Sequence, residues 1–509
     1  MTTGTLILAV GGLLAGSVAA SLVAARLRLP ALLLFLAVGM VAGSDGAGWI
    51  QFDNYALARD IGLVALALIL FDGGLRTGLS EIKRVRGPAL RLAVGATLVV
   101  AVVTGVAAIA LFRLSPLEGL LLGSVVASTD SAAVFGLLRG STLSRRLVQT
   151  LEGEAGFNDP VALVLVLGFM EWTRRPDYSI VDMAVFAVHE FVIGAVCGYL
   201  VARLAVVALT RIRLPWSGLQ PVASVAVAAL AFGTSDTLHG SSLLAVYLAG
   251  LVLGDAPIPG RQATGIFHDG AAWVAQIGLF VTLGLLVFPS RLGAAAPEGI
   301  ALALVVVLIA RPLATALATA RQGFSVPERA VLSWAGLRGG GPVVFATFPV
   351  AANLPGSEVL FDVVFFAVVV STLLQGLTFE ALARRLGLTS VTPLLPRPLS
   401  DAGGARSLGA ELVEYSVSPV DGVVGRRVRD LVLPLGSTLV LIVRGDQAVP
   451  PVASTRLNAG DMLHFLVREE VAGRIPELLD RLRDPVPRQT LASRMGGGRL
   501  ARPTRHRAG

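Results

Sequence analysis

Long aliphatic runs, separated by short polar or Gly/Pro-containing segments, fill the first 385 residues of the chain. A helix needs about 20 apolar residues to cross a bilayer, and about thirteen runs approach this length. The runs lie near residues 4–25, 30–47, 56–75, 88–112, 116–138, 148–170, 180–209, 217–238, 240–256, 270–289, 298–320, 328–350 and 360–384. The pattern predicts an all-α polytopic membrane protein with about thirteen transmembrane helices.

The pattern changes after residue 388. Residues 389–410 are rich in Pro, Gly and Ser and predict a linker, and residues 411–484 alternate short apolar stretches with polar turns. Within the latter, ELVEYSV, TLVLIVRG and DMLHFLV predict strands, whereas VGRRVRDL and AGRIPELLDRL predict helices. Residues 485–509 predict a disordered basic tail. We therefore expect a transmembrane domain (1–388), a linker, a small cytosolic α/β domain and a tail.

Composition supports a membrane protein. Hydrophobic residues make up 54% of the chain and charged residues 15%, whereas soluble proteins carry about 25% charged residues. The formal net charge of +8 does not indicate nucleic-acid binding, because the basic residues are mostly Arg at the ends of apolar runs. The single cysteine, Cys197, excludes an intrachain disulfide.

Basic and acidic loops alternate along the membrane domain. The basic loops carry Arg26, Arg28, Lys83, Arg84, Arg86, Arg139, Arg145, Arg146, Arg211, Arg213, Arg321 and Arg329. Because cytoplasmic loops are enriched in Lys and Arg, this side is expected to be cytoplasmic. An odd number of spans then places the N-terminus outside and the C-terminus inside, in agreement with Arg384 and Arg385 after the last span.

Two runs are interrupted in the middle of the membrane. The first contains GSVVASTDSAAVFG (123–136), and the second, seven runs later, contains WAGLRGGGPVVFATF (334–348). Paired interruptions of this kind are typical of transporters with inverted repeats, in which two discontinuous helices cross at the binding site. The alternative is close packing of glycine-rich helices. Close packing does not explain why Asp130 and Arg338 occur in the interruptions.

Asp159 is the strongest candidate for an ion site. It directly precedes the apolar run PVALVLVLGF, and Pro160 suits the first turn of a helix, so Asn158 or Asp159 is expected at a helix start. A carboxylate removed from water can hold either a proton or a cation near neutral pH, which is the minimum requirement for exchange. The alternative is an ordinary helix cap at the membrane interface. Glu152, earlier in the same segment, is expected to face water in a loop.

The interruptions contribute further candidates. Asp130 can neutralise the positive N-terminal ends of half-helices, Arg338 can neutralise the negative C-terminal ends, and Thr129 can offer oxygen to an ion. Glu154 and Arg311 also lie in apolar surroundings, and pairing them would satisfy both charges.

The role of Asp72 is open between two interpretations. It lies in LILFDGGLR, where it can reach the ion site or act as an interfacial residue near Arg76. We find no nucleophile–base pair, no metal-ligand cluster and no phosphate-binding loop after a strand, and therefore expect no enzyme activity and no resident metal.

At this point the sequence resembles the monovalent cation/proton antiporter family of the NhaP and sodium/proton-exchanger type. The resemblance covers roughly residues 1–385 and rests on four motifs: ASTDSAAVF (127–135), EAGFNDP (154–160), ARP (310–312) and GLRGG (336–340). It implies an inverted repeat of thirteen helices that forms dimers, with a six-helix ion-carrying core in each protomer.

The resemblance also implies residue roles. Asp159 is the expected ion carboxylate and Asn158 its amide neighbour, with Thr129 and Asp130 as residues of the crossing. The expected ion-binding set is therefore Asp159, Asn158, Thr129, Asp130 and Asp72. The expected structural ion pair is Glu154–Arg311, and Arg338 with Asp130 is expected to balance the charge of the crossing helices.

Two positions depart from the family's pattern. Ala155 stands where the family has Ser, so one hydroxyl ligand is missing, and Ser131 stands where many sodium exchangers have Pro. The segment TDSAAVF (129–135), which contains Ser131, is more similar to the potassium/proton branch of the family. Residues 411–484 resemble the C-terminal ligand-binding subdomain of the regulator-of-potassium-conductance (TrkA-C) family. Such modules dimerise, and some bind cyclic di-AMP.

The predicted function is potassium/proton antiport across a bacterial inner membrane, with a contribution to pH homeostasis. Exchange is expected to be electroneutral, one potassium ion for one proton, and regulated by the cytosolic domain. The alternative is a sodium/proton antiporter of the same fold, and a ligand-gated cation channel is a less favoured class. The expected partners are monovalent cations, protons, membrane lipid and a second copy of the chain.

Overall fold

A computed structural model of the chain describes residues 2–388 and 410–483, apart from gaps at 28, 132, 135–142, 213–215, 217, 257, 259, 420, 446 and 469–474. The chain divides into two compact units, residues 1–390 and residues 391–509. The predicted linker, up to residue 409, and the predicted tail lie outside the described residues.

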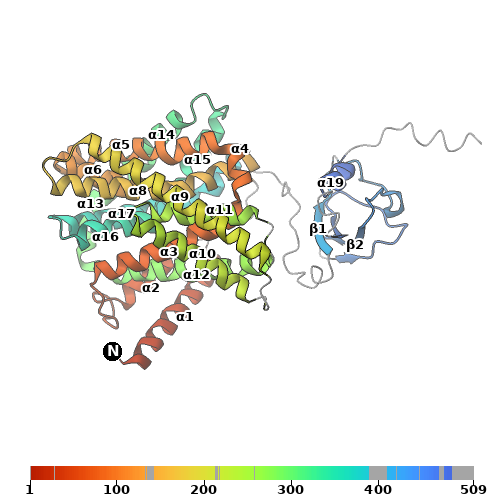
Figure 1. The fold of residues 1–509 in the computed structure, drawn as a ribbon, viewed down its shortest axis with the longest axis horizontal. Helices are drawn as coiled ribbons and strands as arrows, with labels where there is room; N and C mark the ends of the chain where they lie inside the picture. The colour runs from red at the N-terminus through yellow and green to blue at the C-terminus, as the bar shows by residue number, and fades with distance from the viewer. Residues whose placement is uncertain are drawn as a thin grey trace, which may run out of the picture. The chain divides into compact units, whose positions relative to one another are not determined.

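The first unit is a bundle of α-helices, drawn in Figure 1. Its elements are α1 (Thr3–Leu27), α2 (Ala31–Ala42), α3 (Tyr55–Thr77), α4 (Leu79–Leu90), η1 (Arg91–Ala96), α5 (Thr97–Phe112), α6 (Pro116–Ala127), α8 (Arg145–Arg174), α9 (Ile180–Arg211), α10 (Leu219–Thr237), α11 (Ser242–Asp255), α12 (Arg261–Leu285), α13 (Pro289–Val305), η2 (Val306–Ala310), α14 (Arg311–Ala318), α15 (Val326–Trp334), α16 (Gly340–Ala351) and α17 (Ser357–Arg385). Each apolar run of the sequence overlaps at least one of these helices.

Several of these helices have the length and composition of membrane spans. Among the described residues, seven helical segments are long and apolar enough to cross a bilayer, and α2, α6, α11 and α16 are shorter apolar helices. Helices suit this environment because every backbone polar group is satisfied within the segment. The first unit is therefore that of a multi-pass membrane protein.

Helix α3 is central to the packing of the bundle. It packs against α11, α12 and α16, whereas α8 packs against α4 and α6. Helix α1 lies at the edge of the bundle in Figure 1, and only 6% of its most apolar window is buried. Its apolar surface is therefore open to lipid or to another chain.

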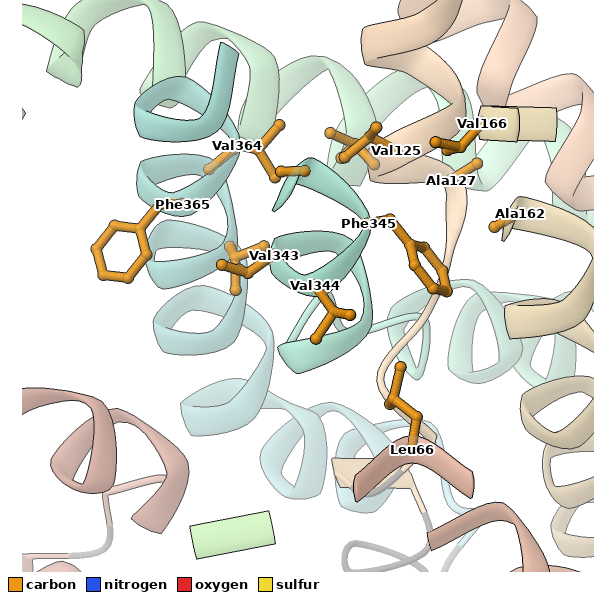
Figure 2. Close-up of a cluster of buried hydrophobic side chains, with 14 of the residues drawn as sticks. Leu66, Val125, Ala127, Ala162, Val166, Val343, Val344, Phe345, Val364 and Phe365 are labelled. Atoms are coloured by element: carbon orange, nitrogen blue, oxygen red, sulfur yellow. The ribbon is translucent and has the colours of Figure 1, made fainter. Parts of the chain in front are cut away.

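The interior of the bundle is apolar and dense. Figure 2 shows Leu66 of α3, Val125 of α6, Ala162 of α8, Phe345 of α16 and Val364 of α17, all within one cluster of buried side chains. Each of these five side chains is 3% exposed or less. Such packing holds the shorter helices α6 and α16 in place, because close-packed interiors resist small displacements.

Two helical segments change their hydrogen-bond pattern in mid-course. The π-helical segment η1 joins α4 to α5, and η2 joins α13 to α14. Segment η2 ends directly before Arg311, the charged residue of an otherwise apolar segment. Short π-helical segments within α-helices occur frequently at functional sites.

The second unit is a small α/β domain. Its antiparallel sheet has the order β1-β4-β2-β3, formed by β1 (Ala410–Ser416), β2 (Ser437–Arg444), β3 (Gln447–Val449) and β4 (Met462–Arg468), and it is accompanied by α19 (Ile475–Arg483). The three predicted strands coincide with β1, β2 and β4.

The predicted helix over 424–431 is wrong. This segment contains only the short 3-10 helix η3 (Val428–Asp430). Gly425 adopts a positive φ of 80° and donates its N–H to the carbonyl of Leu457 at 2.7 Å, so the backbone bonds outside the segment in place of a helical turn.

A buried carboxylate fixes one end of this sheet. Asp461, only 1% exposed, accepts two hydrogen bonds from the Arg444 guanidinium at 2.8 Å each and a third from the Asn458 N–H at 2.8 Å. Burial alone would raise the pKa of Asp461, but these donors outweigh it and hold the pKa below its usual value. The contact therefore ties β2 to the turn before β4.

Candidate functional site

Two interrupted helical segments meet in the middle of the first unit. Helix α6 ends at Ala127, and the helical conformation resumes at Ser131. The other interruption separates α15 from α16 at residues 335–339. The backbone N–H of Asp130 donates to the carbonyl oxygen of Leu337 at 2.8 Å, so the two interruptions are hydrogen-bonded to each other.

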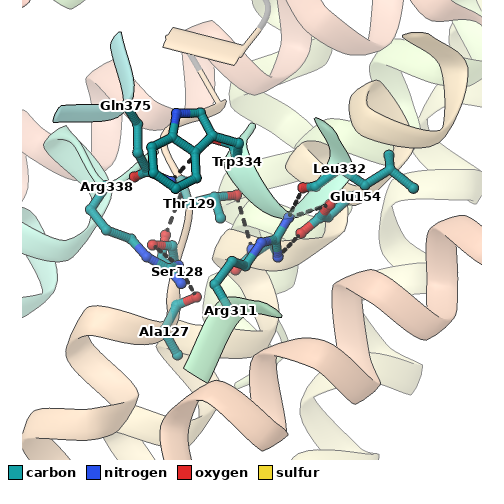
Figure 3. A network of polar contacts seen from close by, with 10 residues as sticks. Ala127, Ser128, Thr129, Glu154, Arg311, Leu332, Trp334, Arg338 and Gln375 are labelled. Atoms are coloured by element: carbon teal, nitrogen blue, oxygen red, sulfur yellow. Dashed lines mark hydrogen bonds and ion pairs between the residues drawn. The ribbon is translucent and has the colours of Figure 1, made fainter. Parts of the chain in front are cut away.

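The C-terminal end of α6 is stabilised by Arg338 from the other interruption. Its guanidinium donates to the carbonyl oxygens of Ala127 and Ser128 at 2.6 and 2.7 Å (Figure 3). These carbonyls lack helical partners, and a cation is favourable at the negative end of a helix. The guanidinium therefore lies at the C-terminal end of α6, and a role of Arg338 in balancing helix ends stays a prediction.

Asp130 lies at positive helix ends. Its Oδ1 accepts from the Ala133 N–H at 3.1 Å, as an N-cap side chain does for the resumed helix. Its Oδ2 lies against Gly339, directly before α16, where an added Cβ would be only 1.6 Å from this oxygen. Only glycine permits this approach. Asp130 is 4% exposed, so its charge acts in a dry environment.

Asp159 lies against the interruption of α6 and is fully buried. The hydroxyl of Ser128 donates to its Oδ1, and the hydroxyl of Ser131 donates to its Oδ2 at 3.2 Å. Among the described residues, no Lys, Arg or His lies within ion-pair distance of this carboxylate. The carboxylate is therefore supported by neutral donors, an arrangement that leaves its charge available to a cation or a proton.

The expected helix start at Asn158 or Asp159 is wrong. Helix α8 continues from Arg145 to Arg174, with Pro160 in its interior. Pro160 has no N–H for the carbonyl of Gly156, a loss that membrane helices tolerate where neighbouring groups surround the freed backbone. Glu152 also lies within α8 and is partly buried, so the expectation of a loop residue that faces water is wrong as well.

Asn158 binds the interruption after α6 through Thr129. Its amide Nδ2 donates to Thr129 Oγ1 at 3.0 Å, and both side chains are buried. The amide oxygen of Asn158 has no hydrogen-bond partner among the described residues. Asn158, the neighbour of Asp159 in sequence, thus contributes a buried amide oxygen that is available to a ligand.

Glu154 and Arg311 form an ion pair one turn of α8 away from Asp159. Arg311 donates to both carboxylate oxygens of Glu154, with 2.9 Å between its second terminal nitrogen and Oε2, and both side chains are 2% exposed. The same nitrogen donates to the Leu332 carbonyl at 3.1 Å, near the C-terminal end of α15 (Figure 3). The pair therefore joins α8, α14 and α15.

Asp72 lies near the end of α3 and is 4% exposed. Arg76 donates to its Oδ2 at 2.8 Å and to Asp269 of α12 at 2.6 Å. This geometry matches the second of the two interpretations offered for Asp72. A direct role for it in ion binding stays a prediction.

Sequence reasoning missed several polar residues of the site. Ser128 was not singled out, although it stands beside the Thr-Asp pair in ASTDS. In α17, the Thr372 hydroxyl donates to the Arg338 carbonyl at 2.7 Å, and the Gln375 amide donates to the Trp334 carbonyl at 3.0 Å. Polar residues one helical turn apart in the apolar stretch VVVSTLLQG were the available signal.

Comparison with known proteins places this architecture in a family. Residues 12–385 match the model of the transmembrane sodium/hydrogen exchanger family. The chain is 38% identical over 467 residues to the K(+)/H(+) antiporter NhaP2 of Shewanella baltica (strain OS223). This alignment covers 91% of this chain and 81% of that relative. It is 36% identical over 445 residues to the K(+)/H(+) antiporter NhaP of Alkalimonas amylolytica, covering 86% and 77% of the two chains.

A solved structure has the same fold. The sodium proton antiporter MjNhaP1 from Methanocaldococcus jannaschii at pH 8 superimposes with a TM-score of 0.64 over 75% of this chain and 99% of that one, at 22% identity. At this identity the likeness concerns the fold alone. The extent of the family match, together with the identity over more than three quarters of the length of both relatives, shows that this chain belongs to the sodium/hydrogen exchanger family of transmembrane antiporters.

Proposed function

We propose that the protein exchanges potassium ions for protons, and that Asp159 carries both in alternation. The observation that supports this most directly is the fully buried Asp159 carboxylate, held by the hydroxyls of Ser128 and Ser131 without a basic partner among the described residues. A carboxylate paired with Arg would keep a fixed charge. This one can be neutralised by either a proton or a monovalent cation.

The choice of potassium rests on the relatives and on Ser131. Both curated relatives described above are named as K(+)/H(+) antiporters. Ser131, where many sodium exchangers have Pro, also favours the potassium/proton branch. Sodium/proton exchange is the second candidate, because MjNhaP1, which shares the fold, is described as a sodium proton antiporter.

The ion-binding set that we propose is Asp159, Asn158, Thr129 and Asp130, with the Ser128 and Ser131 hydroxyls added, and Asp72 as a more distant member. Asp159 exchanges its charge partner, whereas Asp130 and Arg338 balance helix ends, and Glu154–Arg311 braces the core. Exchange of one cation for one proton at a single carboxylate is electroneutral.

The topology that we propose is an inverted repeat of thirteen spans in a bacterial inner membrane. Its support is the pairing of special features seven spans apart: the interruption after α6 with that between α15 and α16, and η1 with η2. The charge of the loops favours an outer N-terminus and a cytoplasmic C-terminus. The exposed apolar surface of α1 supports a homodimer.

The C-terminal unit is proposed to be a TrkA-C-like regulatory domain over residues 411–484. Its four-stranded sheet and terminal helix fit the resemblance of its sequence. Cyclic di-AMP is the leading candidate ligand. This domain is proposed to regulate transport and not to bind the transported ions.

The experiment that tests the function uses purified protein in liposomes loaded with a pH-sensitive dye. Addition of potassium, sodium or lithium to vesicles with an imposed pH gradient should dequench the dye, at the lowest concentration for potassium. A response limited to sodium would favour the second candidate. Flux that does not saturate and is not coupled to the pH gradient would indicate a channel and overturn the proposal.

A further inference from the structure

Three residues of α8 define successive levels on one face of the helix. Glu152, Gly156 and Asp159 follow at intervals of four and three residues, which places them within about 60° of one another around the helix axis. Glu152 lies about 10 Å along the axis from Asp159, on the side toward Arg145. In the proposed topology this is the cytoplasmic side.

Tyr247 of α11 occupies the level between the two carboxylates. Its side chain is completely buried, and a Cβ added to Gly156 would lie only 1.9 Å from its Cζ atom. Its hydroxyl donates to the Glu152 carbonyl oxygen at 3.4 Å, and its ring meets Phe157 edge-on at 5.1 Å. The aromatic ring therefore covers the helix surface between Glu152 and Asp159.

The two carboxylates on either side of the Tyr247 ring differ in solvent exposure. Asp159 is 0% exposed, whereas Glu152 is only partly buried. A small molecule that approaches from the cytoplasmic side of α8 thus meets Glu152 before Tyr247, and Tyr247 before Asp159. Helices α3 and α11 both pack against α8.

The Glu152 carboxylate has little compensation for its charge. Its Oε2 lies 3.4 Å from Thr77 Oγ1, but this hydroxyl also lies 2.9 Å from the Gly73 carbonyl, and one hydroxyl proton serves only one of them well. Among the described residues, no basic side chain lies within 4.0 Å of Glu152. Arg76 already pairs with Asp72 and Asp269.

We propose that Glu152 receives monovalent cations from the cytoplasm and that Tyr247 is the seal between this first position and Asp159. The inference rests on the proposed function and adds a second, transient cation site to it. Transfer requires the Tyr247 ring to leave Gly156, after which the cation passes two helical turns along α8. The negative charge of Glu152 raises the local cation concentration at the closed seal.

The test of Glu152 compares the two faces of the membrane. In everted vesicles the cytoplasmic face is exposed, and Glu152→Gln should raise the KM for potassium about three- to tenfold with little change in kcat, whereas Glu152→Asp should restore it. In right-side-out vesicles both variants should behave like the wild type. Glu171→Gln, on the outer end of the same helix, is the matched control and should leave the cytoplasmic KM unchanged.

The seal is tested separately and does not depend on the fold of a Glu152 variant. Tyr247→Phe keeps the ring and should retain a pH gradient as the wild type does, whereas Tyr247→Ala should leak protons without added cation. An unchanged cytoplasmic KM in Glu152→Gln, an equal rise at both faces, or a tight Tyr247→Ala protein would overturn the inference while wild-type exchange persists. Loss of exchange in the wild type would instead overturn the proposed function.

Discussion

The N–H of Asp130 donates to the carbonyl oxygen of Leu337 at 2.8 Å and so joins two chain interruptions that are separated by about two hundred residues. Each interruption contributes one charged side chain, Asp130 or Arg338, that lies at helix ends of the crossing. The two segments therefore form one structural unit. Asp159 of α8 lies against this unit, and its hydrogen-bond donors are Ser128 in the first interruption and Ser131 at the start of the resumed helix.

The first prediction concerns the exchanged carboxylate. Asp159→Asn should abolish exchange, because the amide is nearly isosteric but cannot trade a proton for a cation. The variant should remain folded and inserted, as judged by size-exclusion chromatography and thermal melting in detergent. Normal exchange by the purified variant in liposomes would remove Asp159 from its proposed role.

A second prediction concerns the hydroxyls that support Asp159. Ser128→Ala should raise the KM for potassium about tenfold, since a hydrogen bond to a charged group is worth about 1.5 kcal/mol or more. Ser131→Ala should have a smaller effect, because its hydroxyl lies 3.2 Å from the carboxylate. The matched control is Ser124→Ala, whose hydroxyl bonds only within α6, to the Leu120 carbonyl. Equal behaviour of the Ser128 and Ser124 variants would contradict the prediction.

The third prediction separates stability from transport. Glu154→Ala or Arg311→Ala should lower the free energy of unfolding by about 3–5 kcal/mol, because each leaves a buried charge unpaired. Asp159→Asn should cost less. As a control, Glu380→Ala removes an exposed partner of Arg384 in α17 and should not change the melting temperature measurably. Wild-type melting of both buried-pair variants would show that the pair does not brace the core.

Much of the site could be predicted because charge in an apolar run is costly. Each of Asp130, Glu154, Asp159, Arg311 and Arg338 interrupts a stretch of aliphatic residues, so each requires a specific reason to be there. Charge balance alone suggested a partner for Glu154, and the structure contains the pair. The order of the apolar runs likewise indicated the helices of the first unit.

Neutral polar residues could not be selected in the same way. Ser128 and Gln375 carry no charge, and serine or glutamine in a membrane helix often bonds within its own segment, as Ser124 does. Pro160 was misleading, because its preference for a first turn is a local property, whereas packing along α8 keeps the helix continuous. The helix predicted over 424–431 is wrong for a similar reason, because the backbone of this segment bonds to residues distant in sequence.

The fourth prediction concerns the C-terminal unit. A chain that ends at Ser390 should still exchange ions, with altered activation by pH or ligand, because the membrane unit holds all the proposed ion-binding residues. Dye dequenching in liposomes, with and without cyclic di-AMP, compares the full and shortened chains. A shortened protein that folds but transports nothing under any condition would show that the domain is essential for transport itself.

The last prediction is electroneutral exchange of one cation for one proton. The neighbour of Asp159 is Asn158, which carries no proton to exchange. A second acid at position 158 would carry a second proton. Asp159 is then either protonated or paired with a monovalent cation, and both loaded forms carry the same charge. Membrane potential consequently has no net charge to act on over a full cycle.

A two-proton exchanger would behave differently by a measurable amount. It would move one net charge, worth about 2.3 kcal/mol at 100 mV, which shifts the equilibrium gradient about fortyfold. Liposomes clamped at zero and at about −100 mV should therefore give the same cation gradient at which proton flux vanishes. Asp130 is the acid that can change this outcome, because it lies at the crossing and is buried. A null gradient that moves with voltage in the wild type, but not in Asp130→Asn, would assign the second charge to Asp130.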